Sequence, residues 1–312
     1  MVNYICKSPV LFLIFNRPEE TRRVFDRIKE VKPSKLYIAA DGPRKNKATD
    51  IELCQKTQAI VNEIDWDCDV KTLFHNINYG CKIAVSNNIT WFFENEVEGI
   101  ILEDDCLPSQ QFFEYCDILL DKYRDDTRIR HISGSNLNAG KISSDTYYFS
   151  KLTSIWGWAS WRRVWKDYDV NLTLFDKVTS LSLFNNIIPD KLVANHFYKQ
   201  FKLIKQSGLD TWDYQYVFCN MINNGLCIQP NYNMISNIGF NKDATHTHDA
   251  ENVLSNLLFE KYDQMVHPDF IIPNVISDIK QVKKYIPSPI QRGKYYLKYH
   301  LKKIVVKLIK LK

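Results

Sequence analysis

The chain has 312 residues, of which 45% are hydrophobic and 13% aromatic, as in a globular protein with a substantial core and unlike a disordered or fibrous chain. The formal net charge of +5 is unevenly spread, because the segment from Lys280 to Lys312 holds 11 of the 41 Lys and Arg residues and none of the 36 Asp and Glu residues. The preceding part therefore has 30 basic and 36 acidic residues. Because nucleic-acid binding requires a basic folded face, we expect no nucleic-acid partner.

The cysteines and the first apolar run indicate a cytoplasmic protein. The eight cysteines show no CxxC or CxxH spacing, so neither a zinc site nor a disulfide framework is predicted. The apolar run at residues 9–15 is too short for a signal peptide or a membrane span. We therefore expect reduced thiols and a cytoplasmic location.

The first 135 residues alternate between short apolar runs and amphipathic stretches. An uncharged, β-rich run predicts a buried strand, and an amphipathic stretch, opened in the first case by Pro18, predicts a helix. The predicted strands are PVLFLIF (9–15), KLYIAA (35–40), residues 70–75 and GIIL (99–102), and the predicted helices begin at Pro18 and cover residues 49–64 and 81–94. This alternation predicts an α/β fold, with a mainly parallel sheet flanked by helices.

The chain after about residue 128 is less regular. RIRHISGSN and TYYFS read as further strands, whereas SIWGWASWRRVW (154–165) and residues 190–207 and 211–223 are predicted to be helical at least in part. No linker signal precedes residues 286–289, which read Ile-Pro-Ser-Pro. We therefore expect one domain at 1–285, with halves at about 1–135 and 136–285, followed by a tail at 286–312.

Polar side chains directly follow the four predicted parallel strands. In strand order they are Asn16 and Arg17, Asp41, His75, and Glu103-Asp104-Asp105. Ligands bind at this edge of such sheets, beyond the carboxyl ends of the strands. Three adjacent carboxylates repel one another, and a Mg²⁺ or Mn²⁺ ion relieves the repulsion when a diphosphate completes its shell. A solvated acidic turn before the next helix is the alternative explanation.

Several of these segments resemble a known enzyme family. GIILEDDCLPSQQFFEY is similar to the strand, EDD triplet and following helix of the N-acetylglucosaminyltransferase I group and of related bacterial nucleotide-diphospho-sugar transferases. PVLFLIFNRPEETRRVFDRI resembles the family's opening strand and arginine-containing loop, KLYIAADG its second strand, and TWDYQ the segment with its catalytic carboxylate. The resemblance spans roughly residues 8–248. It implies a GT-A (Rossmann-like) fold with a nucleotide-sugar-binding first half and an acceptor-side second half.

The resemblance also implies roles for the residues at the strand ends. Asp105 is the expected direct metal ligand, and Asp104 is expected to lie against the ribose and sugar of the donor. Glu103 is expected to orient its neighbours. Arg17, with Asn16 beside it, is expected at the diphosphate.

The resemblance places the base of the nucleotide at Asp41. This carboxylate is expected to accept the imide proton of uracil, which favours a UDP-sugar as the donor. One departure concerns the family's base-contacting histidine before the third helix, because Asn78-Tyr79-Gly80-Cys81 stands there in this chain.

Asp213, in TWDYQ, is the candidate general base. An inverting transfer needs a carboxylate that removes the acceptor's hydroxyl proton while the oxygen attacks the anomeric carbon. The metal ion offsets the charge that develops on the departing diphosphate. A helix N-terminal carboxylate, favoured by the helix dipole, is the alternative explanation of this residue.

The polar run from Asp243 to His248 is predicted to fold over the bound donor and to exclude water. His246 is the expected member of this run at the metal or the diphosphate. Ordinary surface histidines are the alternative.

Four tryptophans lie close together in the sequence and suit either stacking on sugar rings or burial in the core. Their spacing favours the burial of at least two. They are Trp156, Trp158, Trp161 and Trp165.

The tail at 286–312 is cationic and amphipathic. Such a segment is suited to the headgroup region of an anionic membrane, which would place the protein at the inner face of the plasma membrane. A solvated or domain-packed helix is the alternative.

Together these features predict a metal-dependent, inverting glycosyltransferase. It would move a sugar from a nucleotide-diphosphate donor to an acceptor hydroxyl in glycan or surface-polysaccharide synthesis. One alternative is a sugar-nucleotide nucleotidyltransferase, although NRPEET lacks the Gly-rich phosphate loop expected after its first strand. Another is a non-catalytic carbohydrate-binding protein. The donor sugar, the acceptor, the linkage and the oligomeric state are left open by the residues.

Overall fold

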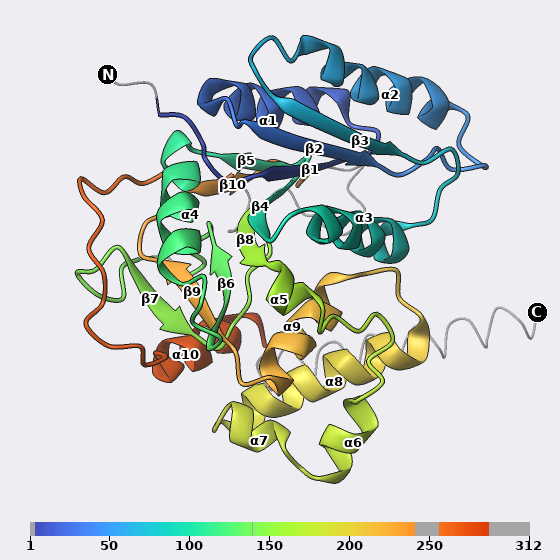
Figure 1. Cartoon of the computed structure of the whole chain (residues 1–312). Coiled ribbons are helices and arrows are strands. Elements are labelled where there is room, and N and C mark those ends of the chain that lie inside the picture. Colours follow the sequence, from blue (N-terminus) through green and yellow to red (C-terminus); the bar gives the residue numbers. More distant parts are fainter. Residues whose placement is uncertain (1–3, 139, 241–255, 287–312) are drawn as a thin grey trace, which may run out of the picture.

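The computed structural model describes residues 4–138, 140–240 and 256–286. Its strands are β1 (Val10–Ile14), β2 (Lys35–Ala40), β3 (Asp69–Phe74), β4 (Glu98–Glu103), β5 (Cys106–Pro108), β6 (Ile129–Ser133), β7 (Tyr147–Ser150), β8 (Trp158–Trp161), β9 (Leu226–Pro230) and β10 (Ile235–Asn237). Eight of them form one sheet in the order β3-β2-β1-β4-β8-β6-β9-β7, and β5 pairs with β10 in a separate antiparallel ribbon (Figure 1).

The first four strands run parallel, in the order β3-β2-β1-β4. All five residues of β1 are buried, because the strand has neighbours on both sides and helices over both faces. The four predicted strands of the first half are therefore confirmed. Each begins and ends within about one residue of the predicted bounds.

The helices are α1 (Pro18–Val31), α2 (Thr49–Gln58, continued by a 3-10 turn at Ala59–Glu63), α3 (Cys81–Asn95), α4 (Gln110–Lys122), α5 (Arg162–Trp165), α6 (Phe175–Ser180), α7 (Phe184–Ile187), α8 (Lys191–Ser207), α9 (Asp213–Ile222) and α10 (Val275–Tyr285). Helix α1 begins at Pro18 and buries Val24, Phe25 and Ile28 on one side, as its sequence pattern predicts. Helices α1 and α2 lie on one face of the sheet, and α3 covers the other face (Figure 1).

The second half of the chain continues the same sheet. Strand β8 lies between β4 and β6 and is antiparallel to both, so the two predicted halves share one sheet. The sheet is therefore mixed, with the parallel part on the side of the first half. Helices α6 to α9 form a second, mostly helical layer around a hydrophobic cluster of their own that includes Phe175, Phe201 and Phe218 (Figure 1).

The tryptophan-rich segment is a strand followed by a short helix. Its first part was predicted to be helical at least in part, but residues 158–161 form β8, because their backbone completes the ladder between two existing strands. Trp158, Trp161 and Trp165 are buried, which confirms the core interpretation for these three rings. Trp156 is only partly buried.

Within the described residues, no helix combines the length and the apolar character that a membrane span requires. The predicted amphipathic tail lies outside these residues, apart from Ile286. The predicted polar run from Asp243 to His248, which includes His246, also lies outside them.

Candidate functional site

The strand order creates a switch point between β1 and β4. The chain runs from β1 outward through β2 to β3 and then returns to place β4 on the other side of β1. In α/β sheets of this order, the crevice beyond the carboxyl ends of such neighbouring strands is the place where ligands bind. Arg17 lies three residues beyond β1, and Glu103 is the last residue of β4. The predicted polar residues of these two strands therefore do meet at one edge.

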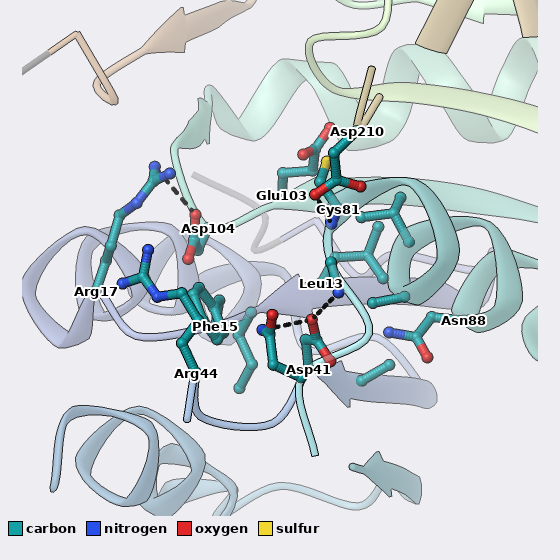
Figure 2. A pocket seen from close by; sticks show the side chains of 16 residues that line it. Leu13, Phe15, Arg17, Asp41, Arg44, Cys81, Asn88, Glu103, Asp104 and Asp210 are labelled. Atoms are coloured by element: carbon teal, nitrogen blue, oxygen red, sulfur yellow. Dashed lines mark hydrogen bonds and ion pairs between the residues drawn. The ribbon is translucent and has the colours of Figure 1, made fainter. Parts of the chain in front are cut away.

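A cavity of about 200 Å³ opens at this switch point (Figure 2). Apolar side chains from the end of β1 and from the first turns of α3 form part of its wall, among them Leu13, Phe15 and Val85. Charged side chains form much of the rest of the wall, among them Arg17, Arg44 and the carboxylates at the end of β4. A flat apolar wall beside a charged rim suits a molecule with an aromatic part and an anionic part.

Arg17 is the cation closest to the acidic triplet. Its Nη1 donates a hydrogen bond to Asp105 Oδ2 at 2.9 Å and lies 3.5 Å from Asp104 Oδ1. The three side chains are 21%, 18% and 9% exposed, respectively, so the charges are largely withdrawn from solvent. The attraction to Asp104 raises the pKa of Arg17, although burial opposes the shift. The sequence led us to expect Arg17 at a diphosphate, whereas here it contacts the carboxylates and offsets part of their charge.

The carboxylates of the triplet have unusual proton affinities. Burial, followed by repulsion from Asp105 and Asp104, raises the pKa of Glu103 well above its ordinary value, and the charge of Asp213 adds to the shift. Burial also raises the pKa of Asp104 to about 7, although Arg17 opposes the shift. Such shifts are typical of functional sites, because a site that holds several acids out of water favours the arrival of a positive charge.

The triplet suits a metal ion that arrives with other ligands, but it does not suit a metal ion that is bound by protein side chains alone. Within the described ranges, no group of three His, Cys, Asp or Glu side chains converges as a metal-binding cluster. A divalent ion that arrives with a diphosphate needs only one or two carboxylates, because phosphate oxygens and water supply the remaining ligands. Asp105 and Asp104 offer oxygen ligands of that kind. The described residues therefore do not form a complete metal site on their own, but two of them fit an ion whose other ligands come from a diphosphate and water.

Asp41, the predicted base-binding residue, lines the same cavity. Its Oδ1 accepts hydrogen bonds from the backbone nitrogens of Gly42 and Tyr79, and its Oδ2 accepts from Gly80 N and Asn78 Nδ2. These four donors already use the acceptor positions of the carboxylate. Asp41 therefore fixes the turn before α3, and an imide proton would have to compete with these donors.

Asn16, also predicted at the donor, faces a different residue. Its Nδ2 donates to Asp50 Oδ1 at 2.9 Å, and Asp50 also pairs with Arg44 at 2.5 Å. The side chain of Asp50 is fully buried, and the Arg44 guanidinium holds its pKa at about 2. Asn16 thus contacts the first turn of α2, and it is not among the residues that line the cavity.

Asp210 is a cavity residue that sequence reasoning missed. Its carboxylate accepts hydrogen bonds from the backbone nitrogens of Cys81 (2.9 Å) and Lys82 (2.7 Å), at the first turn of α3. Gly80 allows this approach, because a Cβ atom there would lie 2.7 Å from Asp210 Oδ2. No local pattern marks Asp210, which follows α8 and lies 129 residues from Cys81 in the sequence.

Asp213 lines a second cavity, of about 280 Å³, between α8, α9 and α10. Trp156, Tyr214, His196 and Gln281 also line it. Asp213 is the first residue of α9 and accepts a hydrogen bond from Thr211 Oγ1. Its charge contributes to the raised pKa of Glu103, after burial and the repulsion from Asp105 and Asp104. Asp213 is thus a helix N-terminal carboxylate that lines the second cavity and not the cavity at the switch point.

The ribbon of β5 and β10 holds the backbone of Asp105. Ile238 N donates to the carbonyl oxygen of Asp105 at 2.8 Å, and Cys106 pairs with Asn237. A Cβ atom at Gly239 would lie only 2.2 Å from Asp105 Oδ2. A glycine is therefore required at this position if the carboxylate is to keep its contact with Arg17.

No protein-family model and no curated protein matches the chain. Solved structures are similar to it only in part of the fold. HddC from Yersinia pseudotuberculosis shares 10% identity with a TM-score of 0.33, over 54% of this chain and 83% of that chain. The 4-diphosphocytidyl-2C-methyl-D-erythritol synthase of Anaerococcus prevotii DSM 20548 shares 10% identity with a TM-score of 0.29, over 52% and 75% of the two chains.

A cytidylyltransferase from Leptospira borgpetersenii serovar Hardjo-bovis (strain JB197) shares 10% identity with a TM-score of 0.31, over 53% of this chain and 64% of that chain. Similarities of this size concern the fold alone and assign no family. The resemblance of the sequence motifs to the N-acetylglucosaminyltransferase I group therefore stays a prediction.

Proposed function

We propose that the chain is a nucleotide-sugar-dependent transferase, and specifically an inverting glycosyltransferase. The observation that carries the proposal is the cavity at the switch point, where Arg17 contacts Asp105 and Asp104 beyond the end of β4. That cavity combines an apolar wall with Arg17 and acidic side chains, as a nucleotide diphosphate with its cation requires. A second, aromatic-lined cavity holds Asp213, whose charge reaches Glu103 in the first. We place the donor in the first cavity and the acceptor in the second.

The residues divide the chemistry between them. Asp105 and Asp104 would hold a Mn²⁺ or Mg²⁺ ion, which when bound offsets negative charge on the diphosphate. Arg17, released from these carboxylates, would bind the diphosphate directly, since guanidinium groups bind phosphate oxygens with paired hydrogen bonds. Glu103, at the end of β4, would keep the two aspartates in place.

Asp213 would act as the general base. Its carboxylate takes the proton from the acceptor hydroxyl while the hydroxyl oxygen forms a bond to the anomeric carbon of the donor sugar. The bond from that carbon to the diphosphate breaks at the same time, and the nucleoside diphosphate leaves with the electron pair. Such a base contributes about 10²–10⁴ in rate. Attack from the side opposite the leaving group inverts the anomeric centre.

The test is a transfer assay with a panel of nucleotide sugars, Mn²⁺ and simple sugar acceptors, on the wild type and on Asp213→Asn. We expect Asp213→Asn to bind the donor with unchanged affinity and to lose at least about 10² of the transfer rate. Asp176→Asn is the matched control, because Asp176 also lies in the first turn of a helix but is 79% exposed and lines neither cavity. Near-normal transfer by Asp213→Asn would refute the assignment of the base.

The same assay separates the two alternatives when a second set of reactions contains a nucleoside triphosphate and a sugar 1-phosphate. A nucleotidyltransferase would release pyrophosphate from a nucleoside triphosphate and a sugar 1-phosphate, and this reaction is included because one of the similar structures is a cytidylyltransferase. Pyrophosphate release without glycosyl transfer would replace our proposal with that activity. Binding of sugars without turnover of any donor would favour a carbohydrate-binding protein.

A further inference from the structure

The side chain of Asn88 lines the switch-point cavity, and its Nδ2 has no protein acceptor among the residues that the structure describes. It lies on α3, two turns after the helix begins, and only 2% of the residue is exposed. Its side chain is among those that line the cavity, with the amide nitrogen directed toward the interior (Figure 2). An amide nitrogen that faces an open cavity can donate its hydrogen bonds to a ligand that binds there.

The orientation of Asn88 is fixed from its other side. His75 Nε2 lies 3.0 Å from Asn88 Oδ1, and because an amide oxygen only accepts, the ring donates from Nε2. The ring of His75 is in turn held edge-on against Tyr79, with the ring centroids 5.1 Å apart. With Oδ1 occupied, Nδ2 is the part of the amide that faces the cavity.

The other amide in the cavity wall has no donor to spare. Asn78 Nδ2 donates to Asp41 Oδ2 at 2.8 Å and to the Gly42 carbonyl at 2.9 Å, which uses both of its hydrogens. Among the described side chains of the wall, Asn88 is thus the uncharged group with a free N–H. It lies on the apolar side of the cavity, beside Ala84 and Val85, and is distinct from the charged end with Arg17.

We infer that Asn88 reads the base of the bound nucleotide and selects a base that offers a carbonyl oxygen, such as uracil, over one that offers an amino group. The inference rests on the proposed function, because it assumes that a nucleoside diphosphate occupies this cavity. The apolar wall holds the ring, and Asn88 Nδ2 donates to the oxygen at position 4 of uracil, because the oxygen at position 2 is common to uracil and cytosine. Cytosine presents an amino group at the equivalent position, so two donors would face each other and neither would be satisfied. His75 acts as a positioning residue through Asn88.

The experiment compares the Kd values of UDP and CDP by calorimetry in the presence of Mn²⁺, for the wild type, Asn88→Leu and Asn88→Asp. We expect the wild type to bind UDP about tenfold more tightly than CDP, as an unpaired polar group implies. Asn88→Leu should bind both equally. Asn88→Asp replaces the donor by an acceptor and should reverse the preference. The ratio of the two Kd values is used because repulsion between the new carboxylate and the diphosphate affects both ligands alike.

His75→Phe tests the positioning role. It keeps an aromatic ring against Tyr79 but removes the hydrogen bond to Asn88, so the UDP preference should fall while the melting temperature changes little. A wild type that prefers CDP, or an Asn88→Asp variant with an unchanged ratio, would overturn the inference and leave the proposed function standing. A wild type that binds neither nucleotide would overturn both.

Discussion

Replacement of Arg17 by Met is expected to destabilise the folded protein, because Met keeps most of the side-chain volume but removes the charge. Arg17 is the guanidinium that contacts both Asp105 and Asp104. Without it, three adjacent carboxylates at the end of β4 remain next to one another and largely out of water. One partner of a buried ion pair is then left without compensation, which is the costly case for such pairs.

The distances give the size of the effect. At an effective dielectric constant of about 20, charges separated by 2.9 Å and 3.5 Å attract each other by roughly 6 and 5 kcal/mol. The cost of removing the guanidinium from water offsets much of this gain, so the net loss in Arg17→Met should be about 3 kcal/mol. The second change Asp105→Asn removes one of the repelling charges and should restore about half of the loss.

Urea denaturation at pH 7.5 measures these free energies of unfolding. Arg128→Met is the matched control, because Arg128 also pairs with an aspartate at 2.7 Å but is 60% exposed, and its loss should destabilise the protein far less than the loss of Arg17. Equal stability of Arg17→Met and Arg128→Met would refute the reasoning. So would a double variant less stable than Arg17→Met alone, since repulsion would then not be the cause.

Two further substitutions test single contacts. Gly239→Ala should displace the Asp105 side chain, because the new Cβ would lie 2.2 Å from Asp105 Oδ2. We expect calorimetry to show a loss of at least about tenfold in the affinity for UDP with Mn²⁺. An unchanged affinity would contradict the proposed role of Asp105. Burial raises the pKa of Asp278 to about 6, above its unfolded value of 3.8, so the folded protein binds the extra proton and stability falls as the pH rises between these values. Asp278→Asn removes this proton linkage, but it also disturbs the hydrogen bonds that the carboxylate accepts from Ser150 Oγ and Lys151 N. The free energy of unfolding of the variant relative to the wild type should therefore be up to about 3 kcal/mol higher at pH 8 than near pH 4, in urea titrations at both pH values; an equal relative free energy at both would point to another cause.

The sequence predicted the frame of the site because that frame depends on local patterns and on one topological rule. Uncharged β-rich runs separated by amphipathic helices indicate parallel strands, and parallel strands place their carboxyl ends at one edge. The meeting of Arg17 with Asp105, 88 residues further along the chain, follows from this rule. The rule does not say which side chains face each other across the edge, so the pairing of Arg17 with the carboxylates was not foreseen.

The residues that were missed depend on contacts between distant segments. Asp210 reaches α3 from the loop after α8, and Asn88 is an ordinary helical residue until His75 orients it. Residues 158–161 were predicted to be partly helical but form a strand for the same reason. The edges of β4 and β6 supply the hydrogen-bond partners that fix an extended backbone there. Local propensity is overruled where the surrounding structure supplies hydrogen-bond partners.

The contact between Arg17 and Asp105 also predicts how a metal ion binds. In the described structure the guanidinium already occupies Asp105 Oδ2, so a metal ion that arrives alone must displace a cation and find its remaining ligands in water. A nucleoside diphosphate changes both conditions, because its oxygens attract Arg17 and complete the shell of the ion. We therefore expect Mn²⁺ to bind weakly to the free protein and at least about tenfold more tightly when UDP is present.

Titration of free Mn²⁺ by electron paramagnetic resonance, with and without UDP, measures this coupling. UDP binds Mn²⁺ by itself, so the Mn²⁺ bound in a titration of UDP without protein is subtracted from the Mn²⁺ bound when protein and UDP are both present. Arg17→Met removes the competing cation, and it should bind Mn²⁺ more tightly than the wild type when no nucleotide is present. Tight binding of Mn²⁺ to the free wild type, unchanged by UDP or by Arg17→Met, would show that the guanidinium and the ion do not compete for the same carboxylate.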